Sequence, residues 1–249
     1  MSAASIARLL PRLFAAIAAL NVLAIAGAMA GRLTLGWAPF SAFKVYVFGA
    51  RTGLYLAALG LATLIVVLIM KLHGQWKYAL LVVVLGLLPL ATGVLVVGPK
   101  RFTGSPMIHD ISTDTSDPPN FISARALRKP GENTLDYGGE KIAKMQQAAY
   151  PDIRPLESDM LPDRAFDRAL DVAAQLKWTL ISSDRSEGHI EAYDTSKLFG
   201  FIDDIVIRIT PEGSGSRIDV RSVSRVGLGD VGANALRIHR FMDAFTGEG

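Results

Sequence analysis

The chain has 249 residues and a formal net charge of +3 at pH 7, but the charge is divided unevenly along its length. Residues 1–99 carry seven basic and no acidic side chains, whereas residues 100–249 carry 19 basic and 23 acidic ones, so the two parts have charges of +7 and −4. Nucleic-acid binding is not expected, because it calls for excess positive charge on the soluble part, and the lack of cysteine excludes disulfides, cysteine-bound metals and thiol catalysis.

Three apolar stretches, at about residues 13–31, 52–70 and 78–98, dominate the first part of the chain. Each approaches the ~20 residues that a helix needs to cross a hydrocarbon core of about 30 Å. None has the polar stripe of a helix that packs on a soluble core. Tyrosine and tryptophan lie near the ends of these stretches, as at a membrane interface. Residues 1–99 are therefore predicted to be a transmembrane anchor of three helices that contacts the lipid bilayer.

The stretches contain no Asp, Glu, Lys, Arg or His. Ion and proton pathways generally use such groups inside the membrane. The sequence therefore favours an anchor over a transporter, and Asn21 is expected to hydrogen-bond between helices.

The orientation of this anchor rests on topology. Four basic residues on one side against five on the other do not decide it by the positive-inside rule. Arg8 and Arg12, followed by an apolar stretch and Ala28-Met29-Ala30, also match a cleaved secretory signal, which stays open as an alternative. Three spans with a cytoplasmic N-terminus, or two spans after cleavage, both put the C-terminal domain outside. We expect a multi-pass protein of the bacterial inner membrane with a periplasmic C-terminal domain.

Residues 100–139 have little periodicity and several prolines. A structureless loop of this length is unusual inside a compact domain. The segment is predicted to be an extended linker, either a strap laid over the following domain or a spacer that lifts it from the bilayer.

Residues 140–249 are predicted to form a soluble α+β domain. Helices are expected at 140–149, 161–177 and 231–245, and strands at 152–157, 178–183, 189–194, 201–210 and 216–226. The last four strands are separated by short turns, which favours an antiparallel meander. Helices that flank one such sheet give a two-layer domain.

Side-chain alternation separates the two faces of this sheet. Ile205, Ile207 and Ile209 share the face that the helices are expected to cover. The opposite face is expected to meet water and to carry a field of charges: Glu191, Asp204, Arg208, Asp219, Arg221 and Arg225.

The sequences FGFIDDIVIR (199–208), DVRSVSRVG (219–227) and GDVGANALRI (229–238) resemble those of the bacterial and plastid family called domain of unknown function 1499. Shorter matches are Ile190-Glu191-Ala192, Tyr150-Pro151-Asp152 and Pro118-Pro119-Asn120-Phe121, and the resemblance covers about residues 108–246. Many relatives have cysteine where this chain has Phe121. Relatives are often exported lipoproteins or membrane-anchored proteins, which implies a position outside the cytoplasm, but the resemblance implies no activity.

A ligand site is predicted where the last strand meets the last helix. Arginine forks and the amides of a helix N-terminus suit a phosphate or carboxylate. Asp230 supports the alternative of a capped, ion-paired corner, because an N-cap would occupy those amides itself. The predicted ligand-binding residues are Arg208, Arg221, Ser222, Ser224, Arg225, Asp230, Asn234 and Arg237.

Catalysis has weaker support. Asp203, Asp204 and Glu191 are the candidate catalytic carboxylates of a hydrolase, with Arg221 and Arg225 stabilising an oxyanion. However, neighbouring strand residues point to opposite faces, so Asp204 is instead expected to pair with Arg208 or Arg221, and Asp203 to cap a turn.

Metal and cofactor binding are not predicted. His109, Asp110, Asp114 and Asp117 have the residue types of a metal site, but their spacing fits no known pattern, and the soluble part contains no catalytic or nucleotide-binding motif. The sequence therefore predicts a membrane-anchored binding module for a partner protein or anionic ligand. The alternatives are the hydrolase and a scaffold whose charges only stabilise the sheet.

Overall fold

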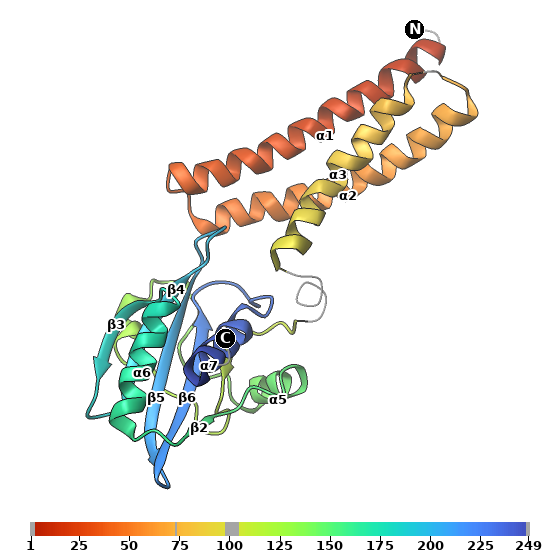
Figure 1. Cartoon of the computed structure of the whole chain (residues 1–249). Helices are drawn as coiled ribbons and strands as arrows, with labels where there is room; N and C mark the ends of the chain where they lie inside the picture. The colour runs from red at the N-terminus through yellow and green to blue at the C-terminus, as the bar shows by residue number, and fades with distance from the viewer. Residues whose placement is uncertain (1–2, 73, 98–104, 248–249) are drawn as a thin grey trace. The chain divides into compact units, whose positions relative to one another are not determined.

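The computed structural model describes residues 3–72, 74–97 and 105–247, and the chain forms two compact units, Met1–Phe102 and Thr103–Gly249 (Figure 1). The first unit consists of three helices, and the second combines a sheet with helices, as the α+β prediction requires.

The three helices of the first unit are α1 (Ala3–Thr34), α2 (Pro39–Ile69) and α3 (Trp76–Val97). Each contains a segment long and apolar enough to cross a membrane, judged by length and composition alone. Helix α2 begins 13 residues before the predicted stretch at 52–70. The prediction began after the charge of Arg51, but lysine and arginine are good helix formers, and Pro39 suits a first helical turn.

Small residues bring α2 and α3 together. A Cβ added at Gly53 would lie 2.4 Å from the carbonyl oxygen of Gly86, and one added at Gly86 would lie 2.5 Å from that of Gly53. The two backbones are therefore in direct contact, as in many membrane helix pairs. Asn21 of α1 donates to the carbonyl of Gly49 of α2 at 2.9 Å, which is the predicted interhelical role.

The second unit contains the predicted antiparallel meander: β3 (Thr179–Asp184), β4 (His189–Thr195), β5 (Ile202–Glu212) and β6 (Gly215–Ser224). Two short strands, β1 (Asp110–Ser112) and β2 (Leu156–Ser158), both pair with β6. The main strand order is β1-β6-β5-β4-β3. Strand β1 was not predicted, because three residues are too few to show alternation.

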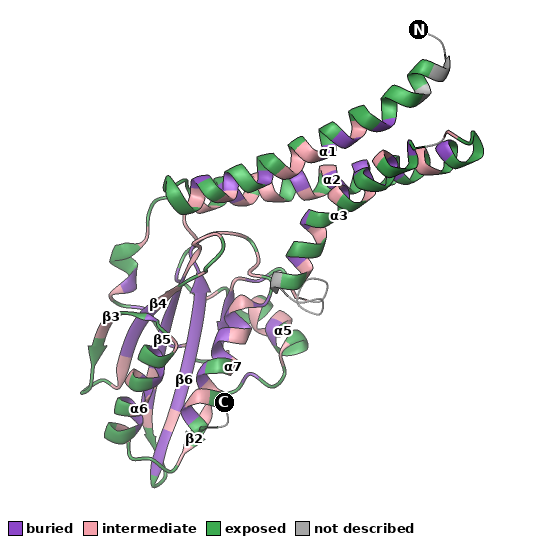
Figure 2. Cartoon of the chain, turned by 45° about the horizontal axis from the view of Figure 1, so that its top comes forward, coloured by how far each residue is buried: buried purple, intermediate pink, exposed green. Residues whose placement is uncertain are grey.

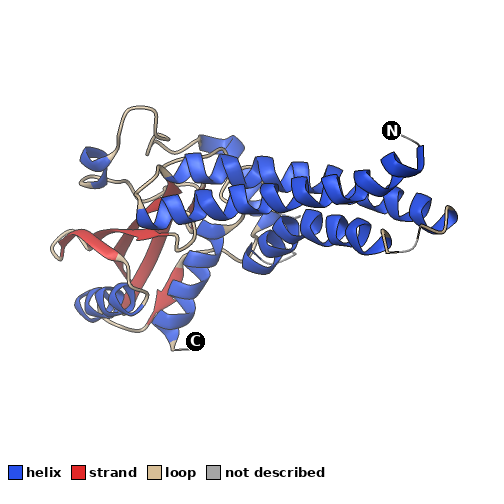
Figure 3. Cartoon of the chain, turned by 90° about the horizontal axis from the view of Figure 1, so that it is seen from above, coloured by secondary structure: helices blue, strands red, loops and turns tan. Residues whose placement is uncertain are grey.

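Helices α6 (Pro162–Gln175) and α7 (Ala233–Thr246) pack on one face of the sheet, and α5 (Gly139–Ala149) lies at its β1 side. Seen from above, α7, which ends beside the label C, runs along the strands (Figure 3). The main core lies between this layer and the sheet, where Ile205 and Ile207 meet Phe166, Ile238 and Phe241.

The opposite face is covered by residues 113–138, here called the strap, which include the short 3₁₀ helix η1 (Ala124–Leu127). Phe121, Ala124 and Leu135 of the strap are buried against Val206 and Val223. These residues of the expected linker therefore lie over the sheet, while its residues 100–104 lie outside the described part of the chain. Figure 2 shows the result, with β5 and β6 buried along most of their length.

The strap overturns one expectation. The charged face of the sheet was predicted to meet water, but Glu191, Asp204, Asp219 and Arg221 are at most 1% exposed. Alternation distinguishes the two faces of a sheet, but it does not say what covers the polar one.

Candidate functional site

The candidate site is the polar face of the sheet, meaning the side that the strap covers. The predicted charged residues all lie here, as alternation requires, and Arg217 joins them from β6. The strap adds further polar groups from Asp114 to Asp136. Charge is therefore concentrated between two layers of the same domain.

Arg221 occupies the centre of this face and is fully buried. Its Nε and Nη2 donate to the two carboxylate oxygens of Asp110 at 2.9 and 2.7 Å. Nη1 donates to the carbonyl of Pro119 at 3.1 Å and Nη2 to that of Leu135 at 2.9 Å. The guanidinium thus joins β6, β1 and two points of the strap, which is an attachment role and leaves little room for a ligand.

Two rings enclose the same guanidinium. Its central carbon lies 5.4 Å from the ring centre of Phe121 and 5.3 Å from that of Tyr137, distances typical of cation–π contacts. Burial, together with the nearby charge of Asp110, raises the pKa of Tyr137 to about 12. Phe121, where many relatives have cysteine, therefore serves as an apolar cover over Arg221 in this chain.

Asp204 holds the end of the polar face nearest the start of β5. Its carboxylate is fully buried and meets Arg225 Nη2 at 2.7 Å and Arg128 Nε of the strap at 2.8 Å. Burial lowers the pKa of Arg128, although Asp204 opposes that effect. The predicted pairing of Asp204 with Arg208 or Arg221 was wrong, because Arg208 lies opposite Asp219 and pairs with it, and Arg221 pairs with Asp110 of β1.

Glu191 anchors the middle of the strap. Its carboxylate accepts hydrogen bonds from the backbone N–H groups of Ile122, Ser123 and Ala124 at 2.6 to 3.0 Å. His189 Nε2 lies 2.8 Å from the same carboxylate. Burial alone would raise the pKa of Glu191, but the bonds from His189 and the three amides outweigh it and lower the pKa.

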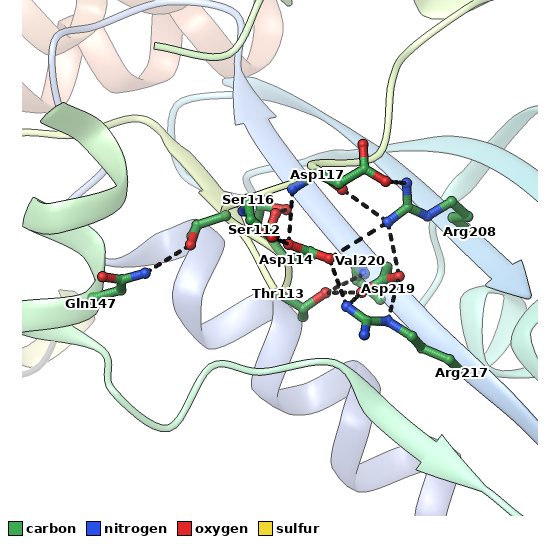
Figure 4. Close-up of polar contacts among 11 residues, drawn as sticks. Ser112, Thr113, Asp114, Ser116, Asp117, Gln147, Arg208, Arg217, Asp219 and Val220 are labelled. Atoms are coloured by element: carbon green, nitrogen blue, oxygen red, sulfur yellow. Dashed lines mark hydrogen bonds and ion pairs between the residues drawn. The ribbon is translucent and has the colours of Figure 1, made fainter. Parts of the chain in front are cut away.

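The far end of the polar face holds five charged residues, here called the Asp114 cluster: Asp114, Asp117, Arg208, Arg217 and Asp219 (Figure 4). Arg208 donates to Asp117 at 2.8 Å and to Asp219 at 3.0 Å. Arg217 donates to Asp114 at 2.6 Å and to Asp219 at 3.1 Å. Asp219 thus lies between two guanidiniums, each of which also holds a carboxylate of the strap.

A turn in the strap positions this cluster. Oδ1 of Asp114 accepts hydrogen bonds from the backbone N–H groups of Ser116 and Asp117, both at 2.9 Å, which is an Asx turn. Burial alone would raise the pKa of Asp114. The two amide bonds and the bond from the Ser116 hydroxyl outweigh burial, so the net effect is a lowered pKa. The hydrogen bonds to Asp219 raise the pKa of Arg217. Both ion-pair partners are therefore held in their charged forms.

The Asp114 cluster is the exposed end of the polar face. The side chains of Arg208 and Arg217 are 24% and 31% exposed, and that of Asp117 is 77% exposed. By contrast, the side chains of Arg128, Arg221 and Arg225 are at most 10% exposed.

Four of the predicted ligand-binding residues lie on the other side of the sheet, between β6 and α7: Ser222 and Ser224 of β6, and Asn234 and Arg237 of α7. Asn234 accepts from Ser222 Oγ at 2.7 Å, and Arg237 Nη2 meets Asp203 at 2.7 Å and Asp194 at 3.0 Å. Because the sheet separates these residues from Arg221 and Arg225, the structure does not bring the predicted corner together.

Asp230 is not the N-cap that the alternative reading expected, since Gly232 holds that position, but its side chain still occupies amides at this helix end. Its carboxylate accepts hydrogen bonds from the backbone N–H groups of Gly232 at 2.8 Å and Asn234 at 2.7 Å, at the start of α7. Burial is the main cause of its raised pKa. The amides that an anion would need at this helix end are thus occupied by the chain itself.

The three candidate catalytic carboxylates are each engaged. Asp203 pairs with Arg237 on the helix-covered face, rather than capping a turn, while Asp204 and Glu191 bind the strap on the polar face. Among the described residues, no group of three or more His, Asp or Glu side chains is placed to hold a metal. Of the four metal candidates, Asp110, Asp114 and Asp117 pair with arginines, and His109 lies 3.5 Å from the carbonyl of Leu228.

Sequence reasoning missed two arginines of this face as site residues. Arg217 alternates with Asp219 and Arg221 along β6, so its face was predictable, but its partner in the strap was not. Arg128 lies in a segment without periodicity and gave no signal.

Comparison with known proteins identifies the second unit. A family model described as "Protein of unknown function (DUF1499)" matches residues 110–245, which is more than half of the chain. The match confirms the resemblance seen in the sequence. A search of the curated proteins finds no match.

Proposed function

Because the chain belongs to the DUF1499 family, whose function is unknown, we propose its role from its own residues. We propose a non-enzymatic binding module, anchored by three helices, that takes an anionic group of a partner protein at the Asp114 cluster. Arginine pairs suit this task, since the planar guanidinium binds carboxylates and phosphates in a fixed geometry.

The exposure of Arg208 and Arg217 is the observation that carries this proposal. The other arginines of the polar face lie inside the domain with their carboxylate partners. Arg217 donates from Nε and Nη2 to Asp219 and from Nη2 to Asp114. Its Nη1 makes no hydrogen bond within the described part of the chain (Figure 4). A partner can therefore reach two guanidiniums here without opening the strap.

Binding would proceed by exchange of carboxylates. The cluster already contains three carboxylates for two guanidiniums, so an additional anion would meet repulsion. Asp117 is the most exposed of the three, and surface ion pairs of this kind contribute only about 0.2–1 kcal/mol. An incoming carboxylate that replaces Asp117 at Arg208 keeps the charges balanced while Asp114 and Asp219 stay in place.

The three helices supply the membrane location in this proposal. Their length and composition are compatible with a membrane protein. We place the second unit on the periplasmic side of a bacterial inner membrane, because three spans with a cytoplasmic N-terminus lead there. The family resemblance to exported proteins supports the same side.

The hydrolase alternative has less support. A catalytic carboxylate needs an oxygen that can reach a substrate, but Asp203, Asp204 and Glu191 are at most 4% exposed, and each is held by its own partners.

Thermal unfolding of the full chain in lipid nanodiscs tests the proposal. A ligand that binds only the folded state raises the melting temperature. Inorganic phosphate, citrate and a polyglutamate peptide are the probes, and we expect the peptide to give the largest increase. Arg217→Gln should abolish the increase, whereas Arg164→Gln, the same change at an exposed arginine of α6, should preserve it.

Two results would contradict anion binding at the cluster. One is a melting temperature that none of the three probes changes. The other is an increase that the two glutamine variants reduce equally, which would mean a general charge effect.

A further inference from the structure

Large apolar side chains are exposed at one end of the second unit. This apolar tip consists of Met107, Leu198, Leu228 and Val231. Met107 and Leu228 are 67% and 76% exposed, which matches the exposed fractions of many apolar side chains on the three apolar helices.

Three segments of the chain form the tip. The backbone N–H of Asp230 donates to the carbonyl of Ile108 at 3.2 Å, and a Cβ added at Gly229 would lie 3.2 Å from Cα of Met107. The backbone N–H of Arg225 donates to the carbonyl of Ile202 at 3.0 Å, which ties the β4–β5 loop to the same end. These backbone contacts place all three segments at the end of the sheet where β1 and β5 begin and where β4 and β6 end.

The chain enters the second unit at this end. Ser105, the first described residue of the unit, follows Val97, the last described residue of α3, by eight residues. Eight residues span at most roughly 28 Å when fully extended. Met107 follows only two residues later, so the tip lies close in the sequence to the end of α3.

We propose that the apolar tip inserts into the interfacial layer of the lipid bilayer that holds the three helices; the inference rests on the proposed function in that the helices must span that bilayer. Exposed apolar side chains next to basic ones favour this layer. Lys197 is exposed beside Leu198, and Lys100 and Arg101 precede the domain in the sequence, which suits anionic headgroups.

Insertion would also orient the rest of the domain. The β5–β6 hairpin extends from the tip to the opposite end of the domain, and β5 alone has 11 residues, or roughly 36 Å at about 3.3 Å per residue. The β5–β6 turn would then point away from the lipid. Leu161 lies at that distant end, because Ser216 at the start of β6 donates to the carbonyl of Met160.

Site-directed spin labelling tests the inference, and the lack of cysteine in the chain allows one label at a time. The full chain is reconstituted in vesicles of phosphatidylethanolamine and phosphatidylglycerol at a ratio of about three to one. Leu228→Cys places the label at the tip. Leu161→Cys is the matched control, a 63% exposed leucine at the opposite end, and Val84→Cys marks the middle of α3.

The readout is collision of the label with oxygen, which concentrates in lipid, and with a water-soluble nickel chelate. We expect labels at 84 and 228 to favour oxygen and the label at 161 to favour nickel. A label at 228 as open to nickel as the one at 161 would overturn the inference, and so would one shielded from both reagents, because protein would then cover the tip. A label at 84 that favours nickel would instead overturn the membrane anchor and with it the proposed function.

Discussion

Individual buried charges on the polar face are each matched by a specific partner. Glu191 shows this most clearly, because its carboxylate receives three backbone amides and His189 while it is fully enclosed. Unpaired charges are costly to bury, and hydrogen bonds to charged groups are stronger than those between neutral groups. At the residue scale, the role of Glu191 is therefore to hold the strap rather than to perform chemistry.

Glu191→Gln should loosen the strap locally. The substitution keeps the size of the side chain but removes its charge and puts an amide donor near backbone donors. It should lower the free energy of local strap opening by about 2 kcal/mol. Exchange of the amides of Ile122, Ser123 and Ala124 should accelerate by about 30-fold, as measured by hydrogen exchange on the full chain. Glu187→Gln, an exposed glutamate in the β3–β4 turn, should leave their exchange unchanged. Equal protection in both variants would show that Glu191 does not hold the strap.

The lowered pKa of Glu191 gives this contact a pH dependence. A carboxyl group with a lowered pKa in the folded state stabilises that state above its unfolded pKa, about 4.3 for glutamate. The stabilisation is lost as the pH falls below that value toward the folded pKa. Strap protection, corrected for intrinsic exchange, should therefore fall more steeply with acid in the wild type than in Glu191→Gln. Parallel pH profiles would contradict this assignment.

At the scale of elements, the strap depends on a few strong attachments in place of regular structure. Arg221 of β6 binds Asp110 of β1 and two backbone carbonyls of the strap. Arg128 of the strap forms an ion pair with Asp204 of β5. Removal of one member of a buried ion pair typically costs 3–5 kcal/mol, because the other charge is left without compensation.

A double-mutant cycle tests the central attachment. Arg221→Met should cost about 3–5 kcal/mol, since it leaves Asp110 buried and unpaired. The double variant with Asp110→Asn should cost about 1–3 kcal/mol less than the sum of the two single changes. Urea unfolding can be followed by Trp178, with Trp37 and Trp76 changed to Phe. Strict additivity would mean that the pair does not interact in the folded protein.

The sequence predicted the helices and strands more reliably than the side-chain contacts between them. Alternation in β5 and β6 separated the two faces, and the short turns between strands gave the meander order, because both signals depend only on local geometry. The strap gave no such pattern, since single side chains such as Phe121 and Arg128 attach it. The partner of Asp204 depended on long-range contacts, since Arg221 pairs with Asp110 of the unpredicted strand β1 and leaves Asp204 to Arg225. The predicted ligand corner combined Ser222 with Arg221, although adjacent strand residues point to opposite faces.

At the scale of the whole molecule, three apolar helices and a DUF1499 domain share one chain. The proposed orientation can be tested with Leu161→Cys as the sole cysteine. A membrane-impermeant maleimide should label it in bacteria whose outer membrane alone is permeabilised. Leu72→Cys, between α2 and α3, should be labelled only after lysis. The reverse pattern would place the domain in the cytoplasm.

The exchange of carboxylates at the Asp114 cluster is the central claim, and calorimetric titration of the full chain with polyglutamate tests it most directly. Asp117→Asn removes the internal competitor for Arg208, so the peptide should bind about two- to fivefold more tightly, the equivalent of a surface ion pair. Asp159→Asn makes the same change in net charge at another exposed aspartate and should have little effect. Equal affinities in the two variants, or weaker binding by Asp117→Asn, would contradict the account.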